Sequence, residues 1–164
     1  TKTAIDGGYK CTCTSPTLKD GSHTISVKAS DNDGNAATAK TATFTVDTVP
    51  PTLQITAPSN DLITNKKTVT VSGKTDDVSS KPVTVTVNGA TVTVGTDGTF
   101  TKDVTLAEGA NTITIVAKDK AGKTTTVTRK VTVDTSAPVI KSVTLTPNPV
   151  DCGKTFIIAV EITD

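Results

Sequence analysis

Residues 83–89 read VTVTVNG, and this stretch decides the fold. Valine and threonine alternate along it, which places the valines on one face of a β-strand and the threonines on the other. The Asn88-Gly89 pair at its end favours a two-residue hairpin turn, because both central residues of such a turn need positive φ. The stretch therefore predicts a strand with one face in a core, followed by a tight hairpin.

The same alternation recurs on both sides of this stretch. Threonine and valine, 37 and 20 of the 164 residues, are β-branched and favour strands. Turn signals at intervals of about 8–12 residues are typical of a β-sandwich, and no segment has sustained helical periodicity. The sequence predicts an all-β chain, with Asp97-Gly98 as a second turn and with seven strands within residues 48–134. Their apolar positions lie at 53–55, 69–71, 83–87, 92–94, 100–106, 113–117 and 127–133.

Part of the sequence is repeated. Residues 44–51 (FTVDTVPP) recur as residues 131–138 (VTVDTSAP), at a spacing of 87 residues (134 − 47). Residues 18–31 match residues 106–119 at nearly the same offset, 88 (106 − 18). A period of about 87 residues is too long for a solenoid repeat and suits a sandwich domain of about 100 residues.

We therefore predict tandem immunoglobulin-like β-sandwich domains, of which only the central one is complete. Residues 1–47 are expected to be the C-terminal part of one domain, residues 48–134 a complete domain, and residues 135–164 the N-terminal part of a third. Each end carries counterparts of only two or three strands and is expected to leave sheet edges unpaired. Two interpretations stay open: the ends are truncated domains, or they complete one another between molecules.

Residues 69–134 resemble bacterial Ig-like modules of the glucodextranase domain B type. The resemblance is carried by residues 73–75 (GKT), 85–89 (VTVNG), 97–100 (DGTF), 108–113 (EGANTI) and 117–122 (AKDKAG). Residues 20–51 are similar to the end of the same broad class of module. The resemblance implies that the Asn-Gly and Asp-Gly pairs are hairpin turns and that residues 119–122 join the last two strands. It is specific for fold and supplies no catalytic residue.

The composition and motifs exclude several classes of function. A net charge of +1, with both signs scattered, gives no basic stripe for nucleic acid, and no apolar run approaches a membrane span. The single histidine, His23, has no nucleophile placed to use it, and is expected to be an exposed turn residue. Cys11, Cys13 and Cys152 have no zinc spacing and are expected to be unpaired, or to pair with a cysteine outside this sequence. We predict that the chain is not an enzyme and has no cofactor, with calcium as the one candidate ligand.

The first calcium candidate is the loop that holds Asp31, Asp33 and Asn35. These residues place oxygen ligands at alternate positions, as in the first half of a calcium loop. The glutamate that completes such a loop is absent, because position 42 is alanine. The alternative is a hairpin turn in which Asp and Asn side chains bond their own backbone.

A second candidate lies at the joints between domains, which are Asp47 with Pro50 and Pro51, and Asp134 with Pro138. In an Ig-type sandwich the entering linker lies at the same end as two of the loops. This arrangement predicts that Asp47 lies near Asp76, Asp77 and Asp119, and Asp134 near Asp164, where shared carboxylates bind a cation. The alternative is an extended, solvated linker. The prolines predict a rigid joint in either case.

These observations favour a non-enzymatic spacer and adhesion module of an extracellular bacterial surface protein. The alternatives are an accessory domain of a secreted glycoside hydrolase and a decoration domain of a phage tail or virion. The expected partners are other domains of the same polypeptide, and then a cell-surface glycan or protein. Neither nucleic acid nor membrane insertion is expected.

Overall fold

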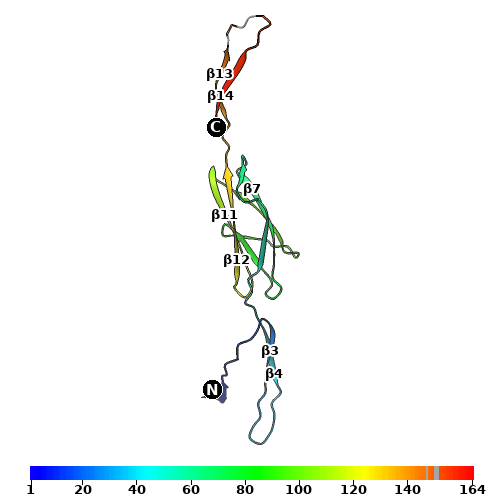
Figure 1. Ribbon diagram of the computed structural model, residues 1–164. Helices are drawn as coiled ribbons and strands as arrows, with labels where there is room; N and C mark the ends of the chain where they lie inside the picture. Colours follow the sequence, from blue (N-terminus) through cyan, green and yellow to red (C-terminus); the bar gives the residue numbers. More distant parts are fainter. Residues whose placement is uncertain (147, 150–151) are drawn as a thin grey trace.

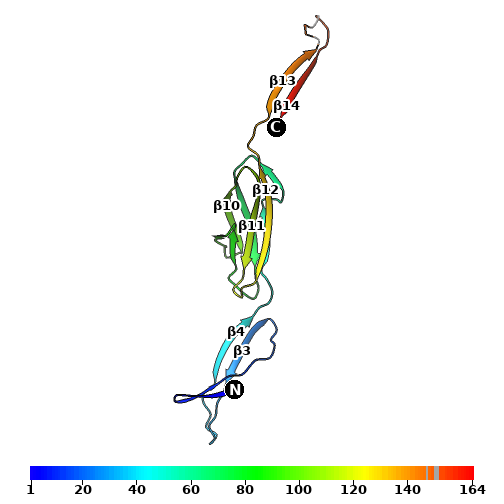
Figure 2. The same cartoon turned by 90° about the vertical axis from the view of Figure 1, so that its left-hand side faces the viewer.

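The protein is built of strands arranged in three parts along one long axis (Figures 1 and 2). The structure, a computed structural model, describes residues 1–146, 148–149 and 152–164. Regular structure in these residues is entirely β. The strands are β1 (Lys2–Ile5), β2 (Gly8–Cys11), β3 (Gly21–Val27), β4 (Lys40–Val46), β5 (Thr52–Ala57), β6 (Leu62–Thr64), β7 (Thr68–Asp76), β8 (Thr84–Val87), β9 (Ala90–Val92), β10 (Thr99–Thr105), β11 (Gly109–Lys118), β12 (Thr124–Val133), β13 (Val139–Thr146) and β14 (Ile157–Thr163).

Strands β5 to β12 form a sandwich of two sheets in the middle of the molecule. One sheet has the order β10-β7-β5 and the other β6-β12-β11-β8-β9. The pairings are antiparallel except for β6 with β12, which is parallel. The predicted all-β sandwich fold is therefore confirmed.

The core lies between these two sheets and follows the predicted alternation. Along β8, Val85 and Val87 are buried, and along β11, Ile113 and Ile115 have no exposed surface. The opposite sheet contributes Val71 and Phe100 to the same cluster. Each buried side chain of this size favours folding by about 1.5–3 kcal/mol, so one apolar face per strand holds the sheets together.

The two predicted turns have different roles. Asn88 and Gly89 both have positive φ, 48° and 81°, and join the paired strands β8 and β9, so this hairpin is confirmed. The expectation of a hairpin at Asp97-Gly98 is wrong, because β9 and β10 belong to different sheets. Here the chain crosses between the sheets, and the Gly98 carbonyl accepts a hydrogen bond of 2.9 Å from the Thr75 N–H.

The central part has eight strands rather than the predicted seven. The additional strand, β6, has only three residues and pairs through them with the end of β12. A strand this short gives no alternating run, so its position depends on a tertiary contact that local sequence does not specify.

In the described residues of the two end parts, all sheets are two-stranded. β1 pairs with β2, β3 with β4, and β13 with β14. Their apolar side chains are exposed, for example Phe156 at 49% and Ile157 at 69%. The domain boundaries at residues 47/48 and 134/135 stay predictions. No helix in the described residues is long and apolar enough to cross a membrane.

Candidate metal centre at the first joint

Two loops of the central sandwich meet at the end that receives the linker from β4. The loop after β7 is tied to the β11–β12 loop, because the Ser80 carbonyl accepts a hydrogen bond from the Lys120 N–H at 3.1 Å. The Ser80 hydroxyl accepts a second bond, from the Ala121 N–H at 2.9 Å. Both loops are therefore held in fixed positions beside the linker.

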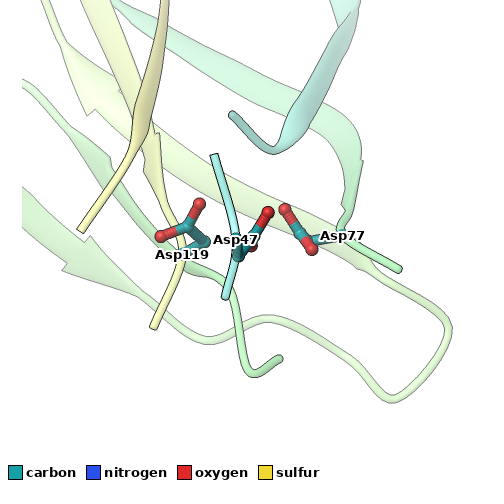
Figure 3. Close-up of side chains that lie close together, drawn as sticks. All are labelled: Asp47, Asp77 and Asp119. Atoms are coloured by element: carbon teal, nitrogen blue, oxygen red, sulfur yellow. The ribbon is translucent and has the colours of Figure 1, made fainter. Parts of the chain in front are cut away.

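Three aspartates converge at this end, one from each segment (Figure 3). Asp47 follows β4, Asp77 follows β7, and Asp119 follows β11. Their exposed fractions are 9%, 6% and 4%. One carboxylate oxygen from each lies within 4.8 Å of the other two. Three acidic groups are thus buried together at the point where the chain enters the sandwich.

Each carboxylate is oriented by backbone donors close to it in sequence. Asp47 Oδ1 accepts from the Val49 N–H at 3.1 Å, and Asp119 Oδ1 accepts from the Lys123 N–H at 2.8 Å. Asp77 Oδ1 accepts from the N–H groups of Ser79 and Ser80, at 2.8 and 2.7 Å. These turns fix the side chains through Oδ1 and leave the second oxygen of each available to the cluster.

The second oxygens of two of these carboxylates have no partner. Asp47 Oδ2 and Asp119 Oδ2 are buried without a hydrogen bond among the described residues. Among all the described residues there is one ion pair, which joins Lys81 Nζ to Asp76 at 2.8 Å. No described basic side chain therefore pairs with the cluster. A buried carboxylate oxygen with neither a hydrogen bond nor a cation beside it is costly, which distinguishes this cluster from an ordinary polar turn.

The sequence predicted that Asp47 lies near Asp76, Asp77 and Asp119, and cation binding by these residues stays a prediction. Asp47, Asp77 and Asp119 lie together, whereas Asp76 is exposed and points to Lys81. The hydrogen bond from the Lys81 ammonium lowers the pKa of the Asp76 carboxyl. Side chains alternate between the faces of a strand, and sequence alone does not say which of two successive aspartates turns inward. The predicted approach of Asp134 to Asp164 stays a prediction.

The first calcium candidate has the geometry of a closed turn. Asp31 Oδ1 accepts from the N–H groups of Asp33 and Asn35, at 3.0 and 2.8 Å, and Asp31 Oδ2 accepts from the Asn35 amide at 2.7 Å. The hydrogen bond from the Asn35 side chain, then that from its backbone, lowers the pKa of Asp31. Both carboxylate oxygens are engaged and all three residues are exposed. Calcium binding at Asp31, Asp33 and Asn35 stays a prediction.

The loop at Asp31 is built like the loop at Asp119. In each, the aspartate N–H donates to the carbonyl four residues on, Asn35 or Lys123, at 3.0 Å. In each, the carboxylate accepts from the N–H of that same residue. The loops differ in the second oxygen, which bonds the Asn35 amide in one and is buried without a partner in the other.

His23 lies in β3 and is partly buried, so the expectation of an exposed turn residue is wrong. Its Nε2 is 2.8 Å from the Lys19 carbonyl, and its ring packs 5.6 Å from that of Phe44. The repeat counterpart Asn111 donates to the Ala107 carbonyl in the same way, at 2.8 Å. A side chain that closes the turn before the strand is thus common to both repeats.

Comparison with known proteins places this architecture in a family. Residues 51–135 match the family model described as glucodextranase, domain B, and residues 1–48 match a bacterial Ig-like domain. Bacillopeptidase F of Bacillus subtilis (strain 168) is 33% identical over 140 residues, which are 85% of this chain and 9% of that protein.

Two solved structures are also similar. The fibronectin(III)-like modules of Clostridium thermocellum CbhA match 71% of this chain and 64% of theirs, with TM-score 0.42 and 21% identity. A tetra-tandem repeat from the extending region of a large adhesion protein matches 88% of this chain and 46% of its own, with TM-score 0.44 and 24% identity. The chain thus spans less than two thirds of each of these proteins. Since the first family model covers more than half of the residues, the chain belongs to the glucodextranase domain B family of Ig-like modules.

Proposed function

We propose that this chain is a non-catalytic spacer in an extracellular multidomain protein. The observation that carries the proposal is the end-to-end arrangement, in which the linkers enter and leave the central sandwich at opposite ends (Figure 1). Adding copies of such a module lengthens the protein without changing its width. The same proposal includes a role in adhesion and a location at the cell surface.

Both joints hold the linker by equivalent contacts, which supports a stiff spacer. At the first joint the Thr48 hydroxyl donates to Asp20 at 2.8 Å. At the second, the Thr135 N–H and hydroxyl donate to the two carboxylate oxygens of Glu108, at 2.7 and 2.8 Å. Asp20 and Glu108 occupy the same place in their repeats, in the turn before the penultimate strand. The contact between this acid and the linker threonine is therefore a property of the repeat.

Small-angle scattering tests the spacer. We expect the maximum dimension of the protein to be that of a chain whose three parts lie in one line. A single conformation should fit the whole scattering profile. A profile that requires an ensemble of bent forms would contradict the proposal, because a freely hinged chain does not set a distance.

The Glu108 contact gives a pH-dependent prediction. The hydrogen bonds from the Thr135 backbone and then from its hydroxyl lower the pKa of Glu108 below its ordinary value. A lowered pKa means that the contact stabilises the joint above the ordinary glutamate range, and that this stability is lost as the pH falls through the lowered pKa. We expect spin labels on Cys152 and on a cysteine at Thr101 to give a narrow distance distribution at pH 7 that broadens as the pH falls below the ordinary glutamate range. The labelled protein carries Cys11→Ser and Cys13→Ser.

A Glu108→Gln variant should broaden the distribution already at pH 7, since the amide lacks the negative charge that strengthens both hydrogen bonds. Glu161→Gln, which changes an exposed acid that accepts its hydrogen bond from Ser142 within the β13–β14 hairpin, is the matched control and should behave as the parent. Equal distributions in the parent and in Glu108→Gln at pH 7 would show that the contact does not hold the joint.

A second candidate function is an accessory domain of a secreted enzyme. It is favoured by the family, whose description names a domain of glucodextranase, and by the similarity to bacillopeptidase F. Binding to a glycan array would support this role over a plain spacer. The virion role stays a prediction.

A further inference from the structure

We propose that Asp47, Asp77 and Asp119 bind one calcium ion, and that the bound ion fixes the first linker to the central sandwich. Calcium binding goes beyond the spacer function and does not depend on it. The second part of the proposal, that the ion fixes the linker, rests on the spacer function. Calcium binding and the fixing of the linker are therefore tested separately.

The first argument is electrostatic. Three carboxylates lie within 4.8 Å of one another, at least nine-tenths buried, without a pairing lysine or arginine among the described residues. Like charges at this distance repel strongly away from bulk water. A divalent cation between them turns that repulsion into attraction, and it gives Asp47 Oδ2 and Asp119 Oδ2 the partner they lack.

The second argument concerns the kind of ion. All three donors are carboxylate oxygens, which hard cations prefer over the nitrogen and sulfur ligands typical of zinc. Calcium binds oxygen at about 2.3–2.6 Å, so two of its ligands lie at most about 5 Å apart. Magnesium binds at about 2.0–2.1 Å and allows at most about 4 Å. All three separations are within 4.8 Å, inside the calcium limit, and magnesium also gives up its water ligands reluctantly.

A path for the ion and its water ligands lies beside the cluster. A cleft of about 450 Å³ is lined by Asp47, Ser79, Ser80, Lys120 and Ala121, and also by Thr43, Phe44 and Thr45. Calcium takes six to eight oxygens, and water entering by this cleft completes the set. Lys81 and Lys120 also line the cleft and are exposed.

The third argument concerns what the ion connects. Asp47 belongs to the segment that leaves β4, whereas Asp77 and Asp119 belong to loops already tied together through Ser80. A shared ion therefore joins the linker to a rigid base. Without it, Asp47 is held by its own turn to Val49 and is repelled by the other two carboxylates.

Calorimetry tests the site directly. Titration of metal-free protein with calcium chloride is expected to show one ion per chain, with weaker binding of magnesium. Asp119→Asn keeps the acceptor for the Lys123 N–H and removes one ligand charge, so affinity should fall at least about tenfold. Asp31→Asn changes the equivalent position of the closed loop and Asp76→Asn the neighbouring exposed acid. Both controls should bind as the parent does.

Lack of binding at millimolar calcium would overturn the proposal, and so would unchanged affinity in Asp119→Asn. Loss of binding in Asp31→Asn, with binding retained in Asp119→Asn, would place the ion at residues 31–35 and overturn it as well.

Thermal unfolding separates a metal ligand from a merely structural acid. Calcium at about 100 times its dissociation constant should raise the melting temperature of the parent by roughly 10 °C. In chelator, Asp119→Asn should melt at the same temperature as the parent or higher, since the substitution removes a repulsion, and it should not respond to calcium. A lower melting temperature than the parent in chelator, with no calcium response in the parent, would show that the carboxylates are structural acceptors only.

Distance measurements across the joint test the mechanical part. The three cysteines are replaced by serine, and labels are placed on cysteines at the exposed positions Thr24 in β3 and Thr101 in β10. We expect a narrow distance distribution in calcium, a broad one in chelator, and a broad one in both conditions for Asp119→Asn. If calorimetry shows calcium binding but the distance distribution does not narrow, the proposal that the ion fixes the linker is wrong. The proposal of a calcium site is then unaffected.

Discussion

Replacing Ile115 by alanine is expected to lower the free energy of unfolding of the central sandwich by about 2–5 kcal/mol. Ile115 has no exposed surface and lies at the centre of β11, between β12 and β8. Truncating it removes apolar contacts and leaves a cavity that the two sheets do not fully close. Small domains are stable by only about 5–15 kcal/mol, so this change removes a large share. Urea unfolding followed by circular dichroism measures it.

Ile63→Ala is the matched control, because this side chain is 73% exposed in β6 of the same sheet. Its unfolding midpoint should move by much less. Equal losses in the two variants would mean that the face of β11 toward the second sheet is not the centre of the core.

Replacing Gly98 by alanine is expected to destabilise the same sandwich for a different reason. A Cβ at this position would lie 2.2 Å from the Thr75 carbonyl oxygen, and φ is +82°. The backbone has to shift, which weakens the hydrogen bond from the Thr75 N–H to the Gly98 carbonyl. We expect a loss of about 1–2 kcal/mol from the left-handed backbone and about 1–3 kcal/mol more from overpacking.

Gly89→Ala separates the two contributions. Gly89 has φ +81°, and nothing lies within 4 Å of an added Cβ, so this variant should show the backbone cost alone. The difference between the two variants in the free energy of unfolding follows from their urea midpoints, if the two unfolding curves have the same slope. A loss in Gly89→Ala as large as that in Gly98→Ala would contradict the predicted contact with Thr75.

Much of the fold could be predicted because local pattern and tertiary structure agree. Alternation from Val83 to Val87 identified buried valines, and Asn88-Gly89 identified the turn, since both signals depend on neighbouring residues alone. β6 was missed because its three residues pair with β12 across about 70 residues of chain. The Asp97-Gly98 turn was misread because a glycine with positive φ suits a crossing between sheets as well as a hairpin.

The joint cluster could be predicted in outline because sandwich topology brings one linker and two loops to the same end. Which aspartate turns inward depends on the register at the end of β7, where Asp76 faces solvent and Asp77 faces the linker. The repeat showed that Asp31 and Asp119 are equivalent. It could not show that the Asn35 amide bonds the second carboxylate oxygen in one loop and that no described residue does so in the other.

The parallel pairing of β6 with β12 determines how the module responds to force. Leu62, Ile63 and Thr64 lie beside Val131, Thr132 and Val133, and the Asp134 N–H adds a bond to the Thr64 carbonyl at 2.9 Å. Tension applied through the two linkers pulls these parallel strands along their length in opposite directions. Their bonds are then loaded in shear and must break together, whereas a hairpin pulled from its open end unzips one bond at a time. A strand of only three residues is thus the one that resists extension of the chain.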